Sequence, residues 1–287
     1  MKSLALNYVL QTARVCISGS KPPLHLSVMN NSIQIIPFTN LVLAFIPAIV
    51  VVVIVWRWGI GYKRSIYALS RMLIQLLLIG YFLVFIFKTD SSLIVIGVLA
   101  VMLFTASWIA LHTRRIPRRV LYLKSFCSIS VGGGIILLLI TQGVLNLHPW
   151  YLPSYVIPLA GIIFANAMNS VSLAVERLEA ETDRNVPYEQ ARIIALRASL
   201  IPVINTMLAV GLVALPGMMT GQILSGISPF IAARYQIMVM CMIFGSAGIS
   251  AAFFLYMVRS NFTTREKTIR QDDRIKQDGV KGKKKIE

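Results

Sequence analysis

The sequence predicts an all-α protein that crosses a membrane with about seven helices, and three observations support this. Of the 287 residues, 56% are hydrophobic and only 14% are charged, whereas soluble domains carry roughly 25% charged residues. The apolar residues gather in continuous stretches of about 20, the length that crosses the hydrocarbon core of a bilayer. The charges are unbalanced, with 28 Lys and Arg against 11 Asp and Glu. A chain this apolar is not a soluble nucleic-acid binder, so its basic excess needs another explanation.

Seven stretches of the chain have the length and composition of membrane-spanning helices. Strands of a membrane barrel alternate apolar and polar residues over about 10 positions, whereas these stretches are continuously apolar. From the N-terminus, the expected helices run over about 36–56, 65–87, 92–111, 125–145, 155–178, 201–224 and 235–258.

The positions of the basic residues predict the orientation of these helices. With seven helices drawn through a membrane, the segments 57–64, 112–124 and 177–197 fall on one side, together with the C-terminal tail. On the other side lie only five of the 28 Lys and Arg residues, namely Lys2, Arg14, Lys21, Lys88 and Arg234. Because cytoplasmic loops carry an excess of Lys and Arg, we expect the N-terminus outside the cell and the C-terminus in the cytoplasm.

The chain divides into three parts along its length. We expect an extracytoplasmic tail over 1–32, one helical membrane domain over 33–258 and a basic cytoplasmic tail over 259–287. The last part has three consecutive lysines at 283–285 and mixes both signs of charge, which is typical of a solvated segment near anionic lipid headgroups. The lipid bilayer is therefore the first expected partner, and we expect no nucleic-acid partner.

The sequence contains no pattern typical of a catalytic or cofactor site. The three cysteines are far apart and form no C-x-x-C pair, so they indicate neither a zinc site nor a redox motif. No G-x-x-x-x-G-K-[ST] run is present to hold a nucleotide. Ser, His and Asp side chains form no triad within the apolar stretches. We therefore expect a protein that is not an enzyme and binds no cofactor itself; whether it binds a metal is left unknown.

Polar side chains inside the apolar stretches are the first candidates for function, because such groups are costly in a membrane. Gln75 lies in the second stretch, too deep to reach the headgroups easily. Asn166 and Asn169 lie in the fifth stretch and share one helix face with Ser170. That face either packs against another helix through hydrogen bonds or lines a water-filled path, and both interpretations stay open.

The sixth stretch contains a predicted helix break. Pro216 has no N–H to donate and is followed by Gly217, so we expect the helix to kink or break there. Interrupted helices near the middle of a membrane are where transporters place their substrates. Met218 and Met219 carry thioethers that suit soft metals, although two methionines in an apolar helix are commonly packing residues. Gln222 lies one turn further along the same segment.

The segment between the fifth and sixth stretches, about 179–199, differs in kind because it is rich in charge. From Tyr188 to Ser199 it has the pattern of an amphipathic helix, with a proline before its first turn. A short cytoplasmic helix of this type either docks a motor subunit or lies on the membrane surface.

Several of these motifs resemble the FetB/YbbM-like family of ABC-transporter permeases, associated with iron export in bacteria and, in plant relatives, with aluminium tolerance. The resemblance covers residues 60–258 and is most specific in the run Leu-Pro-Gly-Met-Met-Thr-Gly at 215–221. Supporting matches are Gln75-Leu76 with Gly80-Tyr81, Asn166-Ala167-Met168, Ala198-Ser199-Leu200-Ile201-Pro202 and Tyr235-Gln236-Ile237-Met238-Val239.

The resemblance implies a permease subunit that pairs with a separate ATP-binding cassette subunit, on which the ATP is bound. It implies a homodimer of the permease in a bacterial inner membrane or a plasma membrane. It also implies that the segment 179–199 is the coupling element, with contacts from Tyr188, Glu189, Arg192 and Arg197.

The sequence thus predicts a permease that exports a metal ion such as iron, or another small solute. Its pathway would be lined by Gln75, Asn166, Asn169, Met218, Met219 and Gln222. One alternative is a stand-alone secondary carrier or channel, which would need a coupling acid that the apolar stretches lack. The other is a membrane anchor for a cytosolic partner, which moves no solute.

Overall fold

A computed structural model describes residues 38–59, 61–87, 91–111 and 118–283, and this part of the chain is helical with short connections. Seven of its helical segments are long and apolar enough to cross a membrane, which confirms the predicted fold class. The expected extracytoplasmic tail over 1–32 lies outside the described residues. The chain forms two compact units, Met1–Tyr62 with Leu215–Gln236, and Lys63–Ala214 with Ile237–Glu287.

The first unit contains two short helices before the first connection and one after the sixth span. Its described elements are α2 (Phe38–Leu43), α3 (Ile46–Arg57), α9 (Gly217–Leu224) and the first residues of α10. Pro47 lies in the first turn of α3, where a missing N–H costs nothing. The helix ends before Gly59, whose φ of +69° is a conformation that glycine adopts without strain.

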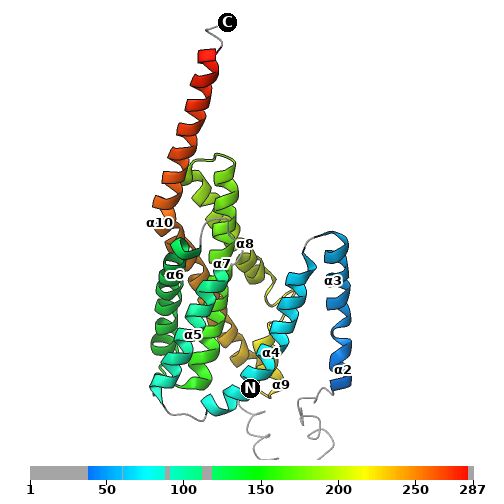
Figure 1. Cartoon of the computed structure of the whole chain (residues 1–287). Helices are drawn as coiled ribbons and strands as arrows, with labels where there is room; N and C mark the ends of the chain where they lie inside the picture. Colours follow the sequence, from blue (N-terminus) through cyan, green and yellow to red (C-terminus); the bar gives the residue numbers. More distant parts are fainter. Residues whose placement is uncertain (1–37, 60, 88–90, 112–117, 284–287) are drawn as a thin grey trace, which may run out of the picture. The chain divides into compact units, whose positions relative to one another are not determined.

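The second unit contains five helices and most of a sixth. Its helices are α4 (Tyr62–Ile86), α5 (Ser92–Ala110), α6 (Arg118–Leu138) with a π-helical turn η2 (Leu139–Val144), α7 (Pro153–Asp183), α8 (Tyr188–Ala209) and α10 (Pro229–Lys283). Within this unit α7 and α8 form an antiparallel pair, and α5 and α6 pack against α7 (Figure 1).

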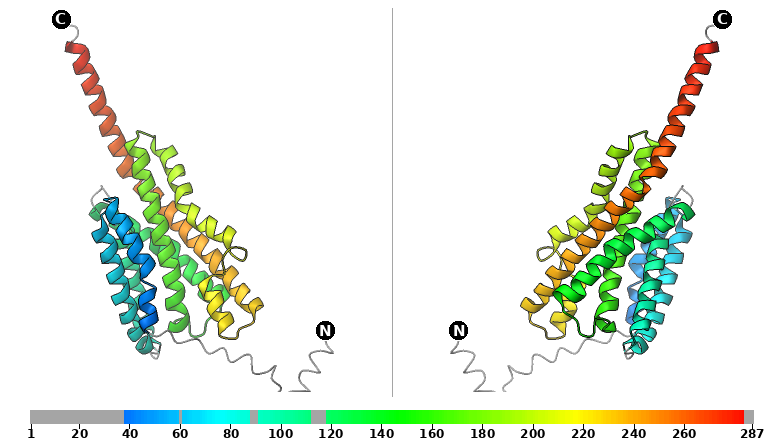
Figure 2. Two further views of the ribbon diagram at one scale, coloured as in Figure 1. Left: turned by 90° about the vertical axis from the view of Figure 1, so that its right-hand side faces the viewer. Right: turned by 90° about the vertical axis from the view of Figure 1, so that its left-hand side faces the viewer.

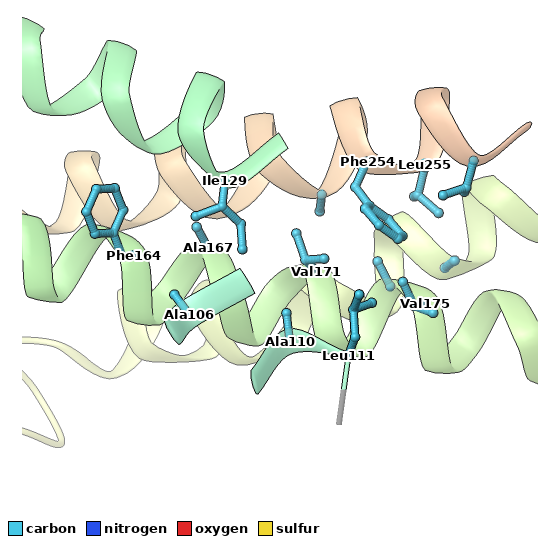
Figure 3. Packing of buried hydrophobic residues seen from close by; sticks show 14 of the residues in the cluster. Ala106, Ala110, Leu111, Ile129, Phe164, Ala167, Val171, Val175, Phe254 and Leu255 are labelled. Carbon is cyan, nitrogen blue, oxygen red and sulfur yellow. The ribbon is translucent and has the colours of Figure 1, made fainter. Parts of the chain in front are cut away.

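Helix α7 is the centre of the second unit because small residues let its neighbours approach closely. Ala167, Val171 and Val175 are fully buried along one of its faces, in the core that Figure 3 shows with residues of α5, α6 and α10. Gly133 of α6 lies so close that an added Cβ would be 3.0 Å from the ring of Phe164. Close backbone approach of this kind is typical of packing between membrane helices.

The α7–α8 pair projects beyond the end of α5. Ala110 at the end of α5 and its C-cap Leu111 lie beside Val171 and Val175 of α7 (Figure 3). Helix α7 continues to Asp183, about 12 Å further at 1.5 Å per residue, and its charged residues begin at Glu176.

The described aromatic residues agree with a bilayer boundary at this level. Trp108 and Tyr122 pack edge to face near this end of α5 and α6, with ring centroids 5.9 Å apart. Trp150 and Tyr155 are exposed at the opposite end. The 20-residue rise from Tyr155 to Val175 is about 30 Å, the thickness of a hydrocarbon core. Aromatic rings at both ends of such a span are typical of membrane interfaces.

The predicted position of the sixth span is wrong. It was expected over 201–224, but the spanning helix is α8, which runs from Tyr188 to Ala209. The charged residues Glu189, Arg192 and Arg197 favoured the interpretation of this segment as a separate helix on the membrane surface. In the structure they lie on partly or fully exposed positions of α8, while Ala191 and Ala195 are fully buried. The charged residues therefore do not prevent this segment from being the first half of a packed helix.

The connection around the sixth span also differs from the expectation. Between α7 and α8 only residues 184–187 are non-helical, and Asn185 takes the left-handed φ of 62° that the tight turn requires. The predicted interruption at Pro216 is confirmed as a break rather than a kink, because α8 ends at Ala209 and Pro216 is the N-cap of the separate helix α9. Helix α10 continues to Lys283, past the α7–α8 turn (Figure 2).

Candidate functional site

A largely apolar cleft with a few neutral polar side chains opens among α7, α8 and α10 of the second unit. Its volume is about 110 Å³. Helix α7 contributes Asn166, Asn169, Ser170 and Leu173, helix α8 contributes Ser199, Pro202, Val203 and Thr206, and α10 contributes Ile243. We call this the α7–α8 cleft.

The two main walls of the cleft are held together by a hydroxyl at its centre. Ser170 Oγ donates a hydrogen bond of 3.4 Å to the carbonyl of Ser199, and both residues are buried. Residues spaced one turn from this pair on α7 and α8 form the rest of the wall, because positions three and four apart share a helix face. The cleft extends along α7 from Leu173, near the level of the α5 end, to Asn166, about 10 Å deeper.

Pro202 leaves a backbone acceptor open in the α8 wall. Proline has no N–H, so it cannot donate to the carbonyl of Ala198 one turn earlier. At membrane depth such a carbonyl is tolerated where it is buried in protein or lines a cavity. Pro202 itself lines the cleft, so the open carbonyl belongs to the same side of α8.

Helix α8 also ends within the expected thickness of the membrane. Helices α7 and α8 are antiparallel and Ser170 lies beside Ser199, so Ala209 at the end of α8 lies level with about residue 160 of α7. That level is roughly 10 Å short of the start of α7 at Pro153. Gly211, with φ of +84°, turns the chain. The N–H of Gly211 donates to the carbonyl of Ala214, and the N–H of Leu212 donates to the carbonyl of Ala209. The carbonyls of Met207 and Leu208, which these two N–H groups would meet in a continuing helix, therefore receive neither of them.

The structure brings two of the six predicted pathway residues together in this cleft, Asn166 and Asn169. Gln75 is exposed on α4 and does not line the cleft. Met218, Met219 and Gln222 lie on α9 in the first unit, and within the described residues the side-chain oxygen of Gln222 is buried without a hydrogen-bond partner.

Sequence reasoning missed the α8 wall of the cleft. Ser199, Pro202 and Thr206 follow one another at spacings of three and four, which places them on one face of a helix. The spacing is a usable signal, but a sixth span that begins at residue 201 places Ser199 in the preceding loop and Pro202 and Thr206 in the helix.

Three of the four residues expected to contact an ATPase form contacts within the chain. Tyr188 is buried and its hydroxyl donates to the carbonyl of Leu255 on α10. Its ring also packs against that of Phe262, with centroids 6.4 Å apart. Glu189 pairs with Arg259 of α10 at 3.2 Å and with Arg192 at 3.0 Å. The fourth residue, Arg197, is exposed.

These contacts build a compact end to the second unit, which we call the helical head (residues 176–197 and 255–262). Its α7 part is held by Glu181, which is buried and lies 2.6 Å from Arg177 and 3.5 Å from Arg184. Burial of a carboxylate is costly unless it is paired in this way. The Tyr188 and Glu189 contacts therefore fix α8 to α10, while the Glu181 pairs hold the last turn of α7.

Among the described residues, no group of three His, Cys, Asp or Glu side chains is placed to hold a metal ion. The polar groups of the α7–α8 cleft are amides, hydroxyls and backbone carbonyls, all of them neutral. A cleft lined by such groups can hold a small solute.

Comparison with known proteins places the chain in a family. Residues 38–263 match the uncharacterised protein family UPF0014. The chain belongs to this family. A UPF0014 membrane protein of Synechocystis is 41% identical over 200 residues, covering 63% of this chain and 75% of the relative. No solved structure matches the chain.

Two named relatives cover more of the chain. The probable iron export permease protein FetB of Escherichia coli is 32% identical over 240 residues, which is 78% of this chain and 91% of FetB. The protein ALUMINUM SENSITIVE 3 of Arabidopsis thaliana is 31% identical over 243 residues, which is 76% of this chain and 87% of that protein. This UPF0014 protein is thus a multi-pass membrane protein with permease relatives, as its motifs predicted.

Proposed function

We propose that this UPF0014 protein is the membrane subunit of an ABC transporter that exports a metal ion, or another small solute, with energy from a separate ATP-binding subunit. The observation that carries the proposal is the α7–α8 cleft, an uncharged, largely apolar cleft with amide and hydroxyl groups in the spanning part of the second unit. Interrupted helices and open carbonyls at this depth are typical of substrate sites in transporters. The name of FetB supports the choice of an iron-like metal as cargo.

In this proposal the helical head faces the cytoplasm. The excess of Lys and Arg on the head side supports that orientation, with the N-terminus outside. The cleft then opens near the cytoplasmic boundary at Leu173 and reaches about halfway across the membrane at Asn166. A cleft of this depth would load a solute from the cytoplasmic side, as export requires.

The ATP-binding subunit would act on the exposed surface of the head, where Arg184 and Arg197 lie. Three residues would then serve as internal links of the head. Tyr188 and Glu189 contact α10, and Arg192 pairs with Glu189 one turn away on α8. A movement of the head would displace α8 and α10 together, and these two helices form two walls of the cleft. We propose two copies of the permease per transporter, one for each ATP-binding subunit.

The proposal is tested by co-expressing the chain with the ATP-binding cassette subunit encoded nearest to it. Co-purification in detergent and ATP-dependent loss of metal from loaded cells are the expected results. Asn169→Ala should lower metal efflux while the complex still forms, and Thr105→Val, which lies outside the cleft, should leave both unchanged.

Two results would contradict the proposal. Efflux driven by an ion gradient in liposomes without any ATPase would show a stand-alone carrier. A stable complex whose loss changes no solute level would show a membrane anchor.

A further inference from the structure

Helix α4 carries a stripe of polar side chains along one face of its first half. Arg64, Arg71 and Gln75 follow one another at spacings of seven and four residues, so they share a helix face. Tyr67 lies beside this face and is 65% exposed, Gln75 is exposed as well, and Arg71 is partly exposed. We call these four residues the α4 polar stripe.

The packing of the other end of α4 gives the depth of this stripe in the membrane. Leu83 and Ile86 pack against a small cluster that contains Val156 of α7, next to the boundary marked by Tyr155. A hydrocarbon core of about 30 Å corresponds to about 20 helical residues, so α4 reaches the boundary on the side of the helical head near residues 63–66. Arg71 then lies about 10 Å inside the hydrocarbon region.

An arginine at this depth requires an anionic partner. Among the described residues Arg71 forms no ion pair. The sequence contains no Asp or Glu before Asp90, so α4 supplies no carboxylate of its own to the stripe. Long side chains of a helix lean towards its N-terminus, which for α4 is the boundary at Arg64. The guanidinium of Arg71 is therefore directed towards the lipid headgroups on the side of the head.

The chemistry of the stripe at headgroup level favours a phosphate group. A guanidinium has five N–H donors and no acceptor, and the hydroxyl of Tyr67 can donate one more bond. A phosphate accepts two parallel bonds from an arginine, and Lys63 adds a further positive charge beside Arg64. The phosphate of a phospholipid already lies at this level, and its acyl chains would meet the exposed side chains of α4 below it, such as Ile74 and Leu78.

We infer that the α4 polar stripe binds the phosphate of an anionic phospholipid in the leaflet on the side of the helical head. A zwitterionic lipid is disfavoured, because its own cation would meet two arginines and a lysine with no carboxylate on α4 to balance them. This inference concerns a lipid partner of α4 and does not depend on the cargo of the transporter or on the presence of an ATP-binding subunit.

The test uses the full chain alone in detergent. Native mass spectrometry follows the binding of palmitoyl-oleoyl phosphatidylglycerol, of phosphatidylcholine with the same acyl chains, and of glycerol phosphate as the free headgroup. Arg71→Gln removes the charge, and Arg71→Lys keeps the charge but loses the fork of donors. Arg197→Gln is the matched control, because Arg197 is an exposed arginine of α8 on the same side of the membrane, with no second basic residue three or four positions away.

We expect one phosphatidylglycerol to bind at least about tenfold more tightly than phosphatidylcholine, since each basic residue near the headgroups adds to the attraction. Arg71→Gln should weaken phosphatidylglycerol binding about tenfold, as loss of a charge-assisted hydrogen bond does. Arg71→Lys should lie between Arg71→Gln and the wild type, and Arg197→Gln should bind like the wild type. Phosphatidylglycerol should also raise the midpoint of thermal unfolding of the wild type but not of Arg71→Gln.

Three results would overturn the inference. Equal binding of the two lipids by the wild type would show that the stripe does not select an anionic headgroup. Equal weakening by Arg71→Gln and Arg197→Gln would reduce the effect to the general positive charge of this surface. Displacement of the lipid by equimolar glycerol phosphate would show a site for a free anion instead of a lipid.

Discussion

The close crossing of α6 and α10 at Gly132 gives a sharp prediction about the second unit. A Cβ added at Gly132 would lie 2.3 Å from the Oγ, 2.7 Å from the backbone nitrogen and 3.0 Å from the Cα of Ser250. The hydroxyl can rotate away, but the backbone atoms cannot. Gly132→Ala must therefore push the two helices apart by about 0.5–1 Å, which is overpacking of a kind that costs about 1–3 kcal/mol.

Gly134→Ala is the matched control on the same helix. An added Cβ there meets nothing within 4 Å, so the variant keeps the gain in helix propensity without any clash. The midpoint of thermal unfolding is measured in detergent by fluorescence-detected size-exclusion chromatography. We expect Gly132→Ala to lie several degrees below Gly134→Ala, since each kcal/mol shifts the midpoint by about 2–4 °C in a chain of this size.

A second change separates the two causes of the clash. Combining Gly132→Ala with Ser250→Gly removes the hydroxyl but not the backbone contacts, so it should restore only part of the lost stability. Equal midpoints for the two alanine variants would refute the reasoning, because the α6–α10 crossing would then be wider than the structure has it.

Three further variants test the head, the turn after α8 and the open wall of the cleft. Tyr188→Phe removes the hydrogen bond to Leu255 and should lower the unfolding midpoint by the equivalent of about 1 kcal/mol, measured in the same assay. Gly211→Ala forces a side chain into the left-handed region, at a cost of about 1–2 kcal/mol, whereas Gly217→Ala, with open space around it, should be neutral or stabilising. Pro202→Ala restores a helical donor and should raise the midpoint while lowering metal efflux, because it closes a backbone acceptor of the cleft; unchanged efflux would remove Pro202 from the site.

The internal links of the head bear on how energy would reach the cleft. Tyr188 and Glu189 both contact α10, and they do so at the start of the helix that forms one cleft wall. The exchange of charge in Glu189→Arg with Arg259→Glu keeps the α8–α10 pair but loses the pair of Glu189 with Arg192, so it is made together with Arg192→Gln in all variants; either single change breaks the α8–α10 pair. If the pair transmits motion, the double variant should restore ATP-driven efflux that both single variants reduce.

The fold class and the number of spans could be predicted from the sequence because they depend on length and hydropathy alone. A continuous apolar stretch of about 20 residues has few alternatives to a membrane helix. The pair Asn166 and Asn169 was also identified correctly as one face of a helix, since their spacing settles it.

Only the tertiary structure decided where the sixth helix begins and what forms the cleft. By hydropathy alone, Glu189 and Arg192 are expected to lie in water outside the spanning helix. In the fold they pair with each other, and Glu189 also pairs with Arg259 of α10. The spanning helix α8 can therefore begin in the helical head. The residues opposite Asn166 in the cleft come from α8. The local sequence around Asn166 does not indicate which helix packs there or which of its faces is turned towards α7. Local composition determines which segments cross the membrane, whereas the contacts between distant segments determine which polar groups meet inside it.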